Sequence, residues 1–180
     1  MNLKICTFVG VVGLLAGRTC LAAEFSADFV DVKGPKTEAG TLYMKGDKVR
    51  RDVTQGTPTI VIYRPDKNLL WTLNPADKTY FEVLGVSIVL TDADLTALKA
   101  AGSIKLVGDE TINGYLCEKY ASNSARNAFS YWESKKLKVV IKMQSEGAYK
   151  TLTEYKSIKE APVPDSMFEL PAGYKKVELK

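Results

Sequence analysis

Residues 40–83 read GTLYMKGDKVRRDVTQGTPTIVIYRPDKNLLWTLNPADKTYFEV, and this stretch decides the fold. Runs rich in Val, Ile, Tyr, Trp and Thr alternate with the turn sequences GD, PD and NPAD. Gly supplies positive φ, Pro fixes φ, and Asp or Asn side chains bond to the local backbone. Strands joined by connections this short run antiparallel, because a parallel neighbour needs a crossover of a dozen or more residues. The stretch therefore predicts a curved, up-and-down antiparallel sheet.

The same strand pattern continues on both sides of this stretch. We expect strands at residues 24–33, 41–45, 48–54, 59–64, 68–73, 78–83, 103–109, 115–121, 129–133, 137–144 and 148–158. Residues 86–90 are ambiguous between a strand and a helical turn. In the tail, Phe168 and Leu170 are expected to pin residues 162–177 to the domain.

One α-helix is expected, at residues 91–101. Thr91 is the N-cap, with Asp94 three residues later as in a capping box. Lys99 suits the negative end of the helix dipole, and Gly102 suits the C-cap. The predicted fold class is mainly β with one helix (α+β), in which a strongly curved antiparallel sheet forms a half-open barrel and the helix is its lid.

The N-terminal segment has the pattern of a secretory signal peptide at residues 1–23. Lys4 gives a short positive region, Ile5 to Ala16 is apolar, and Leu21-Ala22-Ala23 offers a small-residue cleavage site. The apolar run is too short to remain as a transmembrane helix. We therefore expect one domain at residues 24–180, located in the periplasm, with no transmembrane segment in the mature chain.

Composition argues against several function classes. The net charge of +4 falls to +2 without residues 1–23, because these hold two of the 25 basic and none of the 21 acidic residues. So weak a bias does not indicate a nucleic-acid partner. The chain has no histidine, so no Ser-His-Asp or Cys-His relay can form and the commonest zinc ligand is missing. We expect no metal site, no cofactor and no enzymatic activity.

Two residue types could still carry chemistry. The carboxylates with that potential are Glu82, Asp109, Glu110, Glu118 and Glu133, but nothing in their spacing predicts that two of them converge. Cys117 is the one thiol of the mature chain, so no intramolecular disulfide can form, and it is expected to be a small buried apolar side chain on a strand.

Arg51 stands out within the third expected strand. Alternation places Arg51 on one face with the apolar Val49 and Val53. A guanidinium buried there needs hydrogen-bond acceptors. The alternative is that Arg51 extends to the rim of the sheet, with its charge in water.

Several motifs together resemble a known group of proteins. These motifs are GTLYMKGDKVRRD, the Trp-bearing strand before NPADKTYFE, ETINGYLCEKY, the strand pair YWESKKLKVVIK and the terminal PDSMFELPAGYKKV. They are similar to uncharacterised periplasmic proteins related to the lipoprotein-localisation carriers, which are LolA-like, LolB-like and RseB-like. The resemblance implies a strongly curved antiparallel sheet, closed partly by a helix, whose apolar cavity accepts the acyl chains of lipoproteins. It also implies an inward Arg that bonds to the lid, and Arg51 is the matching position.

The expected function is that of a binding protein. A curved sheet has more apolar surface than one short helix can cover, and an uncovered apolar concavity is the usual form of a ligand site. We expect a lipid or an acylated protein to bind there. The expected ligand-binding residues are Leu42, Met44, Arg51, Ile60, Ile62, Trp71, Leu73, Leu95, Leu98, Val139 and Ile141. The alternative is a non-catalytic interaction or envelope-sensor module with a filled core and an envelope protein as its partner.

Overall fold

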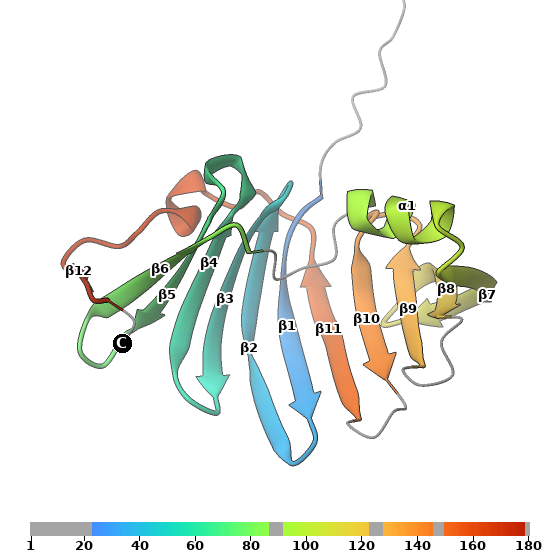
Figure 1. Ribbon diagram of the computed structural model, residues 1–180, viewed down its shortest axis with the longest axis horizontal. Helices are drawn as coiled ribbons and strands as arrows, with labels where there is room; N and C mark the ends of the chain where they lie inside the picture. Colours follow the sequence, from blue (N-terminus) through green and yellow to red (C-terminus); the bar gives the residue numbers. More distant parts are fainter. Residues whose placement is uncertain (1–22, 87–91, 123–127, 146–149, 179–180) are drawn as a thin grey trace, which may run out of the picture.

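A single antiparallel sheet dominates the structure, a computed structural model that describes residues 23–86, 92–122, 128–145 and 150–178. In the described part of the chain, twelve strands pair in the order β12-β6-β5-β4-β3-β2-β1-β11-β10-β9-β8-β7 (Figure 1). All neighbours are antiparallel except the short β12, which pairs parallel with β6. The two halves of the chain join through β1 and β11 at the centre of the sheet.

The secondary-structure elements follow each other in a simple series. The first half contains β1 (Glu24–Lys33), β2 (Lys36–Lys45), β3 (Lys48–Gln55), β4 (Thr59–Arg64), the 3-10 helix η1 (Pro65–Lys67), β5 (Leu69–Asn74) and β6 (Thr79–Leu84). The second half contains α1 (Asp92–Ala100), β7 (Ile104–Ile112), β8 (Tyr115–Ser122), β9 (Phe129–Ser134), β10 (Val140–Ser145), β11 (Thr151–Lys159), the 3-10 helix η2 (Asp165–Phe168) and β12 (Lys175–Lys176).

A mainly β fold with one α-helix is confirmed for the described residues. Gly102 has φ +65° and ends α1 as the expected C-cap, whereas Thr91, residues 1–22 and most of the segment 86–90 lie outside the described residues. The sheet is curved, and β12 and β7 are its two ends, so it is open rather than closed into a barrel. The half-open barrel with a helical lid stays a prediction.

Four strands differ by three residues or more from an expected bound: β2, β7, β10 and β11. β7 ends at Ile112 instead of residue 109, and β11 begins at Thr151 instead of residue 148. β2 begins at Lys36 instead of residue 41, because Gly34 takes φ +59° and turns β1 directly into a long hairpin. β10 begins at Val140 instead of residue 137. There Ser134 Oγ accepts a hydrogen bond from the amide of Leu137, and Lys138 has φ +56°, so these residues form the turn before the strand.

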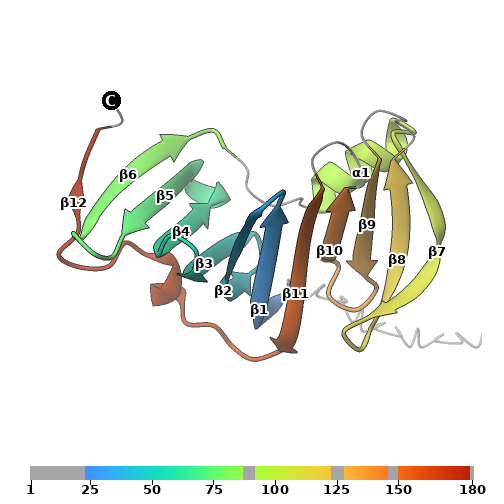
Figure 2. The same cartoon turned by 90° about the horizontal axis from the view of Figure 1, so that it is seen from below.

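The sheet has two faces, which the strand register distinguishes. Directly opposed residues of antiparallel neighbours share a face, and Leu42 opposes both Ala27 and Arg51. We call the face of Leu42 and Arg51 the inner face. The outer face carries Ile62 and Trp71, which oppose each other. Figure 2 shows the sheet bending towards the inner side, with α1 on that side and η2 on the other.

The helix α1 covers one end of the inner face. Leu95 is 1% exposed and packs against Ile104, Tyr120 and Tyr131 of β7, β8 and β9. Lys99 in the last helical turn donates to the buried carboxylate of Glu133 at 2.7 Å. One apolar contact area and one buried ion pair therefore hold α1 on the sheet.

The C-terminal segment, residues 160–178, covers the outer face of β3 to β6. Phe168 is fully buried and Val163 is 5% exposed, and both pack in one cluster with Ile62, Trp71 and Leu73. The expectation that Phe168 pins the terminus to the domain is therefore confirmed. Leu170 is half-buried against the same cluster.

Arg64 at the end of β4 holds the C-terminal segment through hydrogen bonds and an ion pair. Its side chain is buried, forms two hydrogen bonds to Asp66 at 2.7 and 2.8 Å, and donates to the carbonyl of Phe168 at 3.0 Å. It also bonds to the carboxylate of Glu169. The Arg64 guanidinium lowers the pKa of Asp66 to about 2 and lowers the pKa of Glu169 as well.

Replacing Phe168 with Ala should destabilise the protein by about 3–5 kcal/mol, because the substitution leaves a cavity in a buried aromatic site. The matched control is Val177→Ala in the same C-terminal segment, where the side chain is 42% exposed and the expected change is within about 0.5 kcal/mol. Urea unfolding followed by circular dichroism measures both. Equal effects of the two substitutions would contradict the assigned packing.

Arg64 should also make stability depend on acid pH. A carboxyl whose pKa is lower in the folded state adds stability above its unfolded pKa of about 4, and that stability is lost as pH falls through the folded value. Between pH 5 and about pH 2, the parent protein should therefore lose more stability than Arg64→Met, in which Asp66 and Glu169 lack the guanidinium and only Glu169 keeps a further ion-pair partner, Lys67. The measurement is the urea midpoint at each pH. Parallel losses in the two proteins would refute the effect.

Candidate functional site

The strand register divides the expected ligand-binding residues between the two faces. Leu42, Met44 and Arg51 lie on the inner face. The expected residues that lie on the outer face are Ile60, Ile62, Trp71 and Leu73. The expectation that all seven line one concavity is wrong, because β4 and β5 are apolar on both faces and the outer set packs under the C-terminal segment.

The remaining expected residues lie at the helix end of the molecule or near it. Leu95 is buried under α1, and Leu98 is half-buried beside it. Ile141 is fully buried at the start of β10, and Val139 is half-buried just before it. Both belong to the same cluster as Leu42. Whether any of these side chains touches a ligand stays a prediction.

One part of the inner face is filled by side chains. Four of its residues on β1, β2 and β3 have no exposed surface: Phe25, Phe29, Leu42 and Val49. A residue with no exposed surface has no water-sized space beside it. This part of the inner face is therefore a packed core, as protein interiors usually are.

A second part of the inner face is partly open. Val61 directly opposes Arg51, Val83 opposes Leu70, and Phe81 opposes Thr72, so these side chains share the inner face. With Val53 of β3, they are half-buried instead of buried. We call Val53, Val61, Phe81 and Val83 the open strip. None of the four was among the ligand-binding residues expected from the sequence. On β4 the expected residues were Ile60 and Ile62, on either side of Val61, and none was expected on β6.

An ion pair lies where the filled part meets the open strip. Arg51 Nη2 donates to Asp31 Oδ2 at 2.6 Å, and the guanidinium carbon lies 4.0 Å from the centre of the Phe29 ring. The Arg51 side chain is 18% exposed and that of Asp31 is 4% exposed. Arg51 therefore has a buried acceptor, as one of the two sequence interpretations required, and its partner is on β1.

This ion pair does not use all of its hydrogen-bonding capacity. Within the described residues, the buried atoms Asp31 Oδ1 and Arg51 Nε have no hydrogen-bond partner. Such atoms are rare in native proteins, because each unsatisfied buried group costs about 1–3 kcal/mol. The site thus combines an apolar strip with one spare acceptor and one spare donor. Beside it, burial raises the pKa of Tyr155 to about 12.

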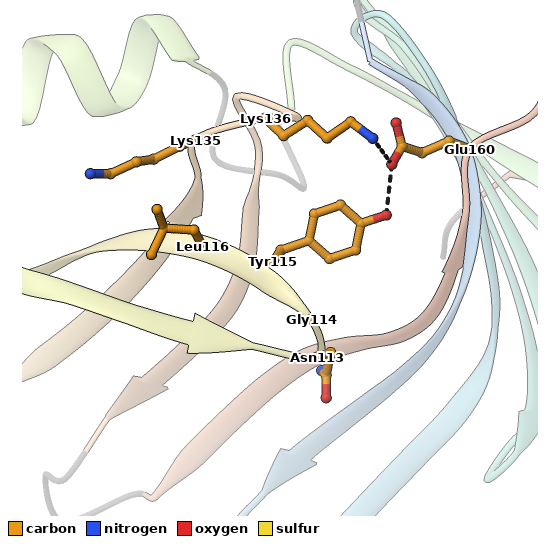
Figure 3. A pocket seen from close by; sticks show the side chains of 7 residues that line it. All are labelled: Asn113, Gly114, Tyr115, Leu116, Lys135, Lys136 and Glu160. Carbon is orange, nitrogen blue, oxygen red and sulfur yellow. Dashed lines mark hydrogen bonds and ion pairs between the residues drawn. The ribbon is translucent and has the colours of Figure 1, made fainter.

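A separate hollow of about 410 Å³ lies at the tip of the β7–β8 hairpin (Figure 3). Glu160 accepts hydrogen bonds there from Lys136 at 2.6 Å and from the hydroxyl of Tyr115 at 2.9 Å. Lys136 is the main reason that the pKa of Glu160 is lowered. Lys135 is bonded to Asp109 at 2.6 Å. Lys135 and Lys136 are each paired with a carboxylate. The contacts of Glu160 with Tyr115 and Lys136 join the β7–β8 and β9–β10 hairpins to the residue that follows β11.

Three of the carboxylates named in the sequence analysis do meet, which their spacing did not predict. Asp109, Glu118 and Glu133 oppose one another across β7, β8 and β9. Each has its own partner. Asp109 bonds to Lys135, Glu118 to the Tyr120 hydroxyl and Glu133 to Lys99. The other two are bonded to tryptophans, Glu82 to Trp71 and Glu110 to Trp132.

The described residues contain neither a metal site nor a membrane-spanning helix. Across residues 23–86, 92–122, 128–145 and 150–178, no group of three or more Cys, Asp or Glu side chains is placed to hold a metal ion. Of the helices in those ranges, none has the length and apolar character needed to cross a membrane. Cys117 is buried and burial raises its pKa, as expected for a packed thiol.

The open, curved β-sheet of this domain has a fold similar to that of several solved structures. The MucA/MucB complex of Pseudomonas aeruginosa superposes with a TM-score of 0.60 at 14% identity, over 88% of this chain and 59% of that chain. A crystal structure of MucB superposes with a TM-score of 0.56 at 14% identity, over 84% of this chain and 58% of that chain. A structure of PNGF-II superposes with a TM-score of 0.52 at 13% identity, over 88% of this chain and 31% of that chain. These identities show similarity of fold alone, and support the expected LolA/LolB-like-related fold.

The chain belongs to the family described as "Domain of unknown function (DUF4412)", whose match covers residues 32–141. This range runs from the end of β1 to β10, so it includes the open strip and Arg51. No curated protein matches the chain. The chain spans 31% to 59% of the length of the three solved chains above.

Removing one partner of the Arg51–Asp31 pair should lower the free energy of unfolding. Asp31→Ala leaves a buried guanidinium without its carboxylate and should destabilise the protein by about 3–5 kcal/mol. Adding Arg51→Met should recover part of this loss, because the unpaired charge is then gone. A double-mutant cycle in urea measures the coupling. Strictly additive effects would show that the two side chains do not interact.

Proposed function

We propose that the protein is a non-catalytic periplasmic binding protein that holds a lipid or a lipoprotein acyl chain on the inner face of its sheet. The observation that carries this proposal is the open strip of Val53, Val61, Phe81 and Val83 beside Arg51. Apolar side chains that line a concave surface and stay partly open to water are the usual form of a ligand site. The proposed ligand site replaces the outer-face residues that were expected from the sequence.

The ion pair at the end of the strip fits an amphiphilic ligand. An acyl chain would lie along the four apolar side chains, and its polar end would approach Arg51. The Arg51 side chain is 18% exposed, so a ligand can reach it without unfolding the core. The polar end would meet the exposed part of the Arg51 side chain, since the unpaired atoms Asp31 Oδ1 and Arg51 Nε are themselves buried.

Three further elements of the proposal rest on sequence and fold. The pattern of residues 1–23 supports export to the periplasm. The absence of histidine from the sequence supports a role without acid–base catalysis near neutral pH. We also propose that α1 acts as the lid of a half-open barrel, because it lies on the inner side of the sheet, where Leu95, Leu98 and the Lys99–Glu133 pair attach it to β7, β8 and β9.

A second candidate function is an interaction or sensor module for an envelope protein. The packed core at Phe25, Phe29, Leu42 and Val49 favours it, since this part of the inner face has no room for a ligand. MucB, which has a similar fold, has been solved in complex with MucA. A partner that binds equally well to variants of the open strip would favour this function over lipid binding.

Lipid binding can be tested with one substitution and one matched control. Delipidated protein should take up a fluorescent fatty acid or lipopeptide, and Val61→Lys should weaken this at least about tenfold, because it puts a charge in the apolar strip. Leu84→Lys adds the same charge at an exposed outer-face position of β6 and should leave affinity unchanged.

Two results would count against the proposal. The absence of uptake by the parent protein, together with the absence of co-purified lipid by mass spectrometry, would remove it. Uptake that Val61→Lys leaves intact would place the ligand somewhere other than the open strip. Circular dichroism at 25 °C verifies that each variant is folded before affinity is compared.

A further inference from the structure

Among the described residues, the strand β7 ends the sheet and its outer edge is unpaired. β7 pairs with β8 on one side and is the last strand in the sheet order of the described residues. It has nine residues, and all side chains from Lys105 to Thr111 are exposed. Figure 2 shows β7 along the rim of the molecule. An edge strand of this length offers a row of free backbone donors and acceptors to another strand.

Apolar side chains add to this edge. Leu106 is 58% exposed and Val107 is 61% exposed, and both lie on β7. Leu116 on the neighbouring β8 is 51% exposed. Natural edge strands are usually kept short or protected by charges and proline. β7 also carries charges and a bulge, but two adjacent exposed aliphatic side chains on so long an edge suit pairing with another strand.

The charges of β7 are complementary to those of a second, antiparallel copy of the same strand. The strand carries Lys105 near its start and the acidic Asp109 and Glu110 near its end. An antiparallel copy of the same strand reverses this order, so basic meets acidic twice across a two-fold axis. We propose that two copies of this protein associate by antiparallel pairing of their β7 strands. This proposal does not depend on the lipid-binding function.

The bulge in β7 determines the register of this pairing. Leu106 opposes Tyr120 and Gly108 opposes Lys119, so Val107 is an extra residue in the strand. The bulge places Lys105 on the same face as Glu110, and Leu106 on the same face as Asp109. Opposed residues must share a face. A two-fold axis between Val107 and Gly108 therefore pairs Lys105 with the second copy's Glu110.

The two side chains are available for this contact. Lys105 is exposed and has no ion-pair partner among the described residues. Glu110 receives hydrogen bonds from Trp132 at 2.9 Å and Lys119 at 3.3 Å, but both go to Oε2. Its side chain remains 45% exposed. The pairing continues the sheet from one copy into the other, and the apolar side chains of the two bulges meet at the axis.

Sedimentation equilibrium on protein purified from cells that express the whole chain tests the association. We expect a monomer–dimer equilibrium. Lys105→Glu should raise the dissociation constant about tenfold, because it places like charges opposite each other twice. The control Lys36→Glu makes the same charge change at an exposed position of β2 and should leave the equilibrium unchanged.

Cysteine cross-linking tests the register. Across the proposed axis the two Val107 Cα atoms lie about 6 Å apart, within the range of a disulfide. Val107→Cys should therefore give a covalent dimer on mild oxidation, whereas the control Leu84→Cys should not. A monomer at every concentration would overturn the proposal. So would a dimer that Lys105→Glu leaves unchanged and Val107→Cys does not cross-link.

Discussion

The structure depends on one constraint, the period-two alternation of side chains in a sheet that is covered on both faces. The core strands β4 and β5 send Ile62 and Trp71 outwards to Phe168 and send Tyr63 and Leu70 inwards to the main cluster. A shift of one residue in either strand would exchange these two sets. The C-terminal segment and α1 can each cover their own side only because this register is fixed.

This constraint also separates what the sequence could predict from what it could not. Turn residues such as Gly46 and Pro65 and the C-cap Gly102 are local signals, so the pairing of successive strands and the helix followed from them, whereas the pairings of β1 with β11 and of β12 with β6 did not. The inner and outer sets of β4 were not separable, because Ile60, Val61 and Ile62 are all apolar. The lining residues were therefore chosen one position away from the open strip on that strand.

Contacts between residues far apart in the sequence were the other feature that could not be predicted from the sequence. The Arg51–Asp31 pair joins β3 to β1, and Arg64 reaches Glu169 across 105 residues of chain. Sequence analysis could say that Arg51 needed an acceptor, but no spacing rule identifies which carboxylate supplies it. Phe168 was identified correctly, since a large aromatic residue near an end of the chain has few uses besides anchoring that end.

The central claim is that the open strip on the inner face, and not the apolar outer face of the same strands, receives an apolar ligand. Nuclear Overhauser effects between a bound fatty acid and the methyl groups of the protein test it most directly. We expect such effects for Val53, Val61 and Val83, and none for Ile60 and Ile62 under the C-terminal segment. Effects at the outer-face methyl groups, or at none, would contradict the claim.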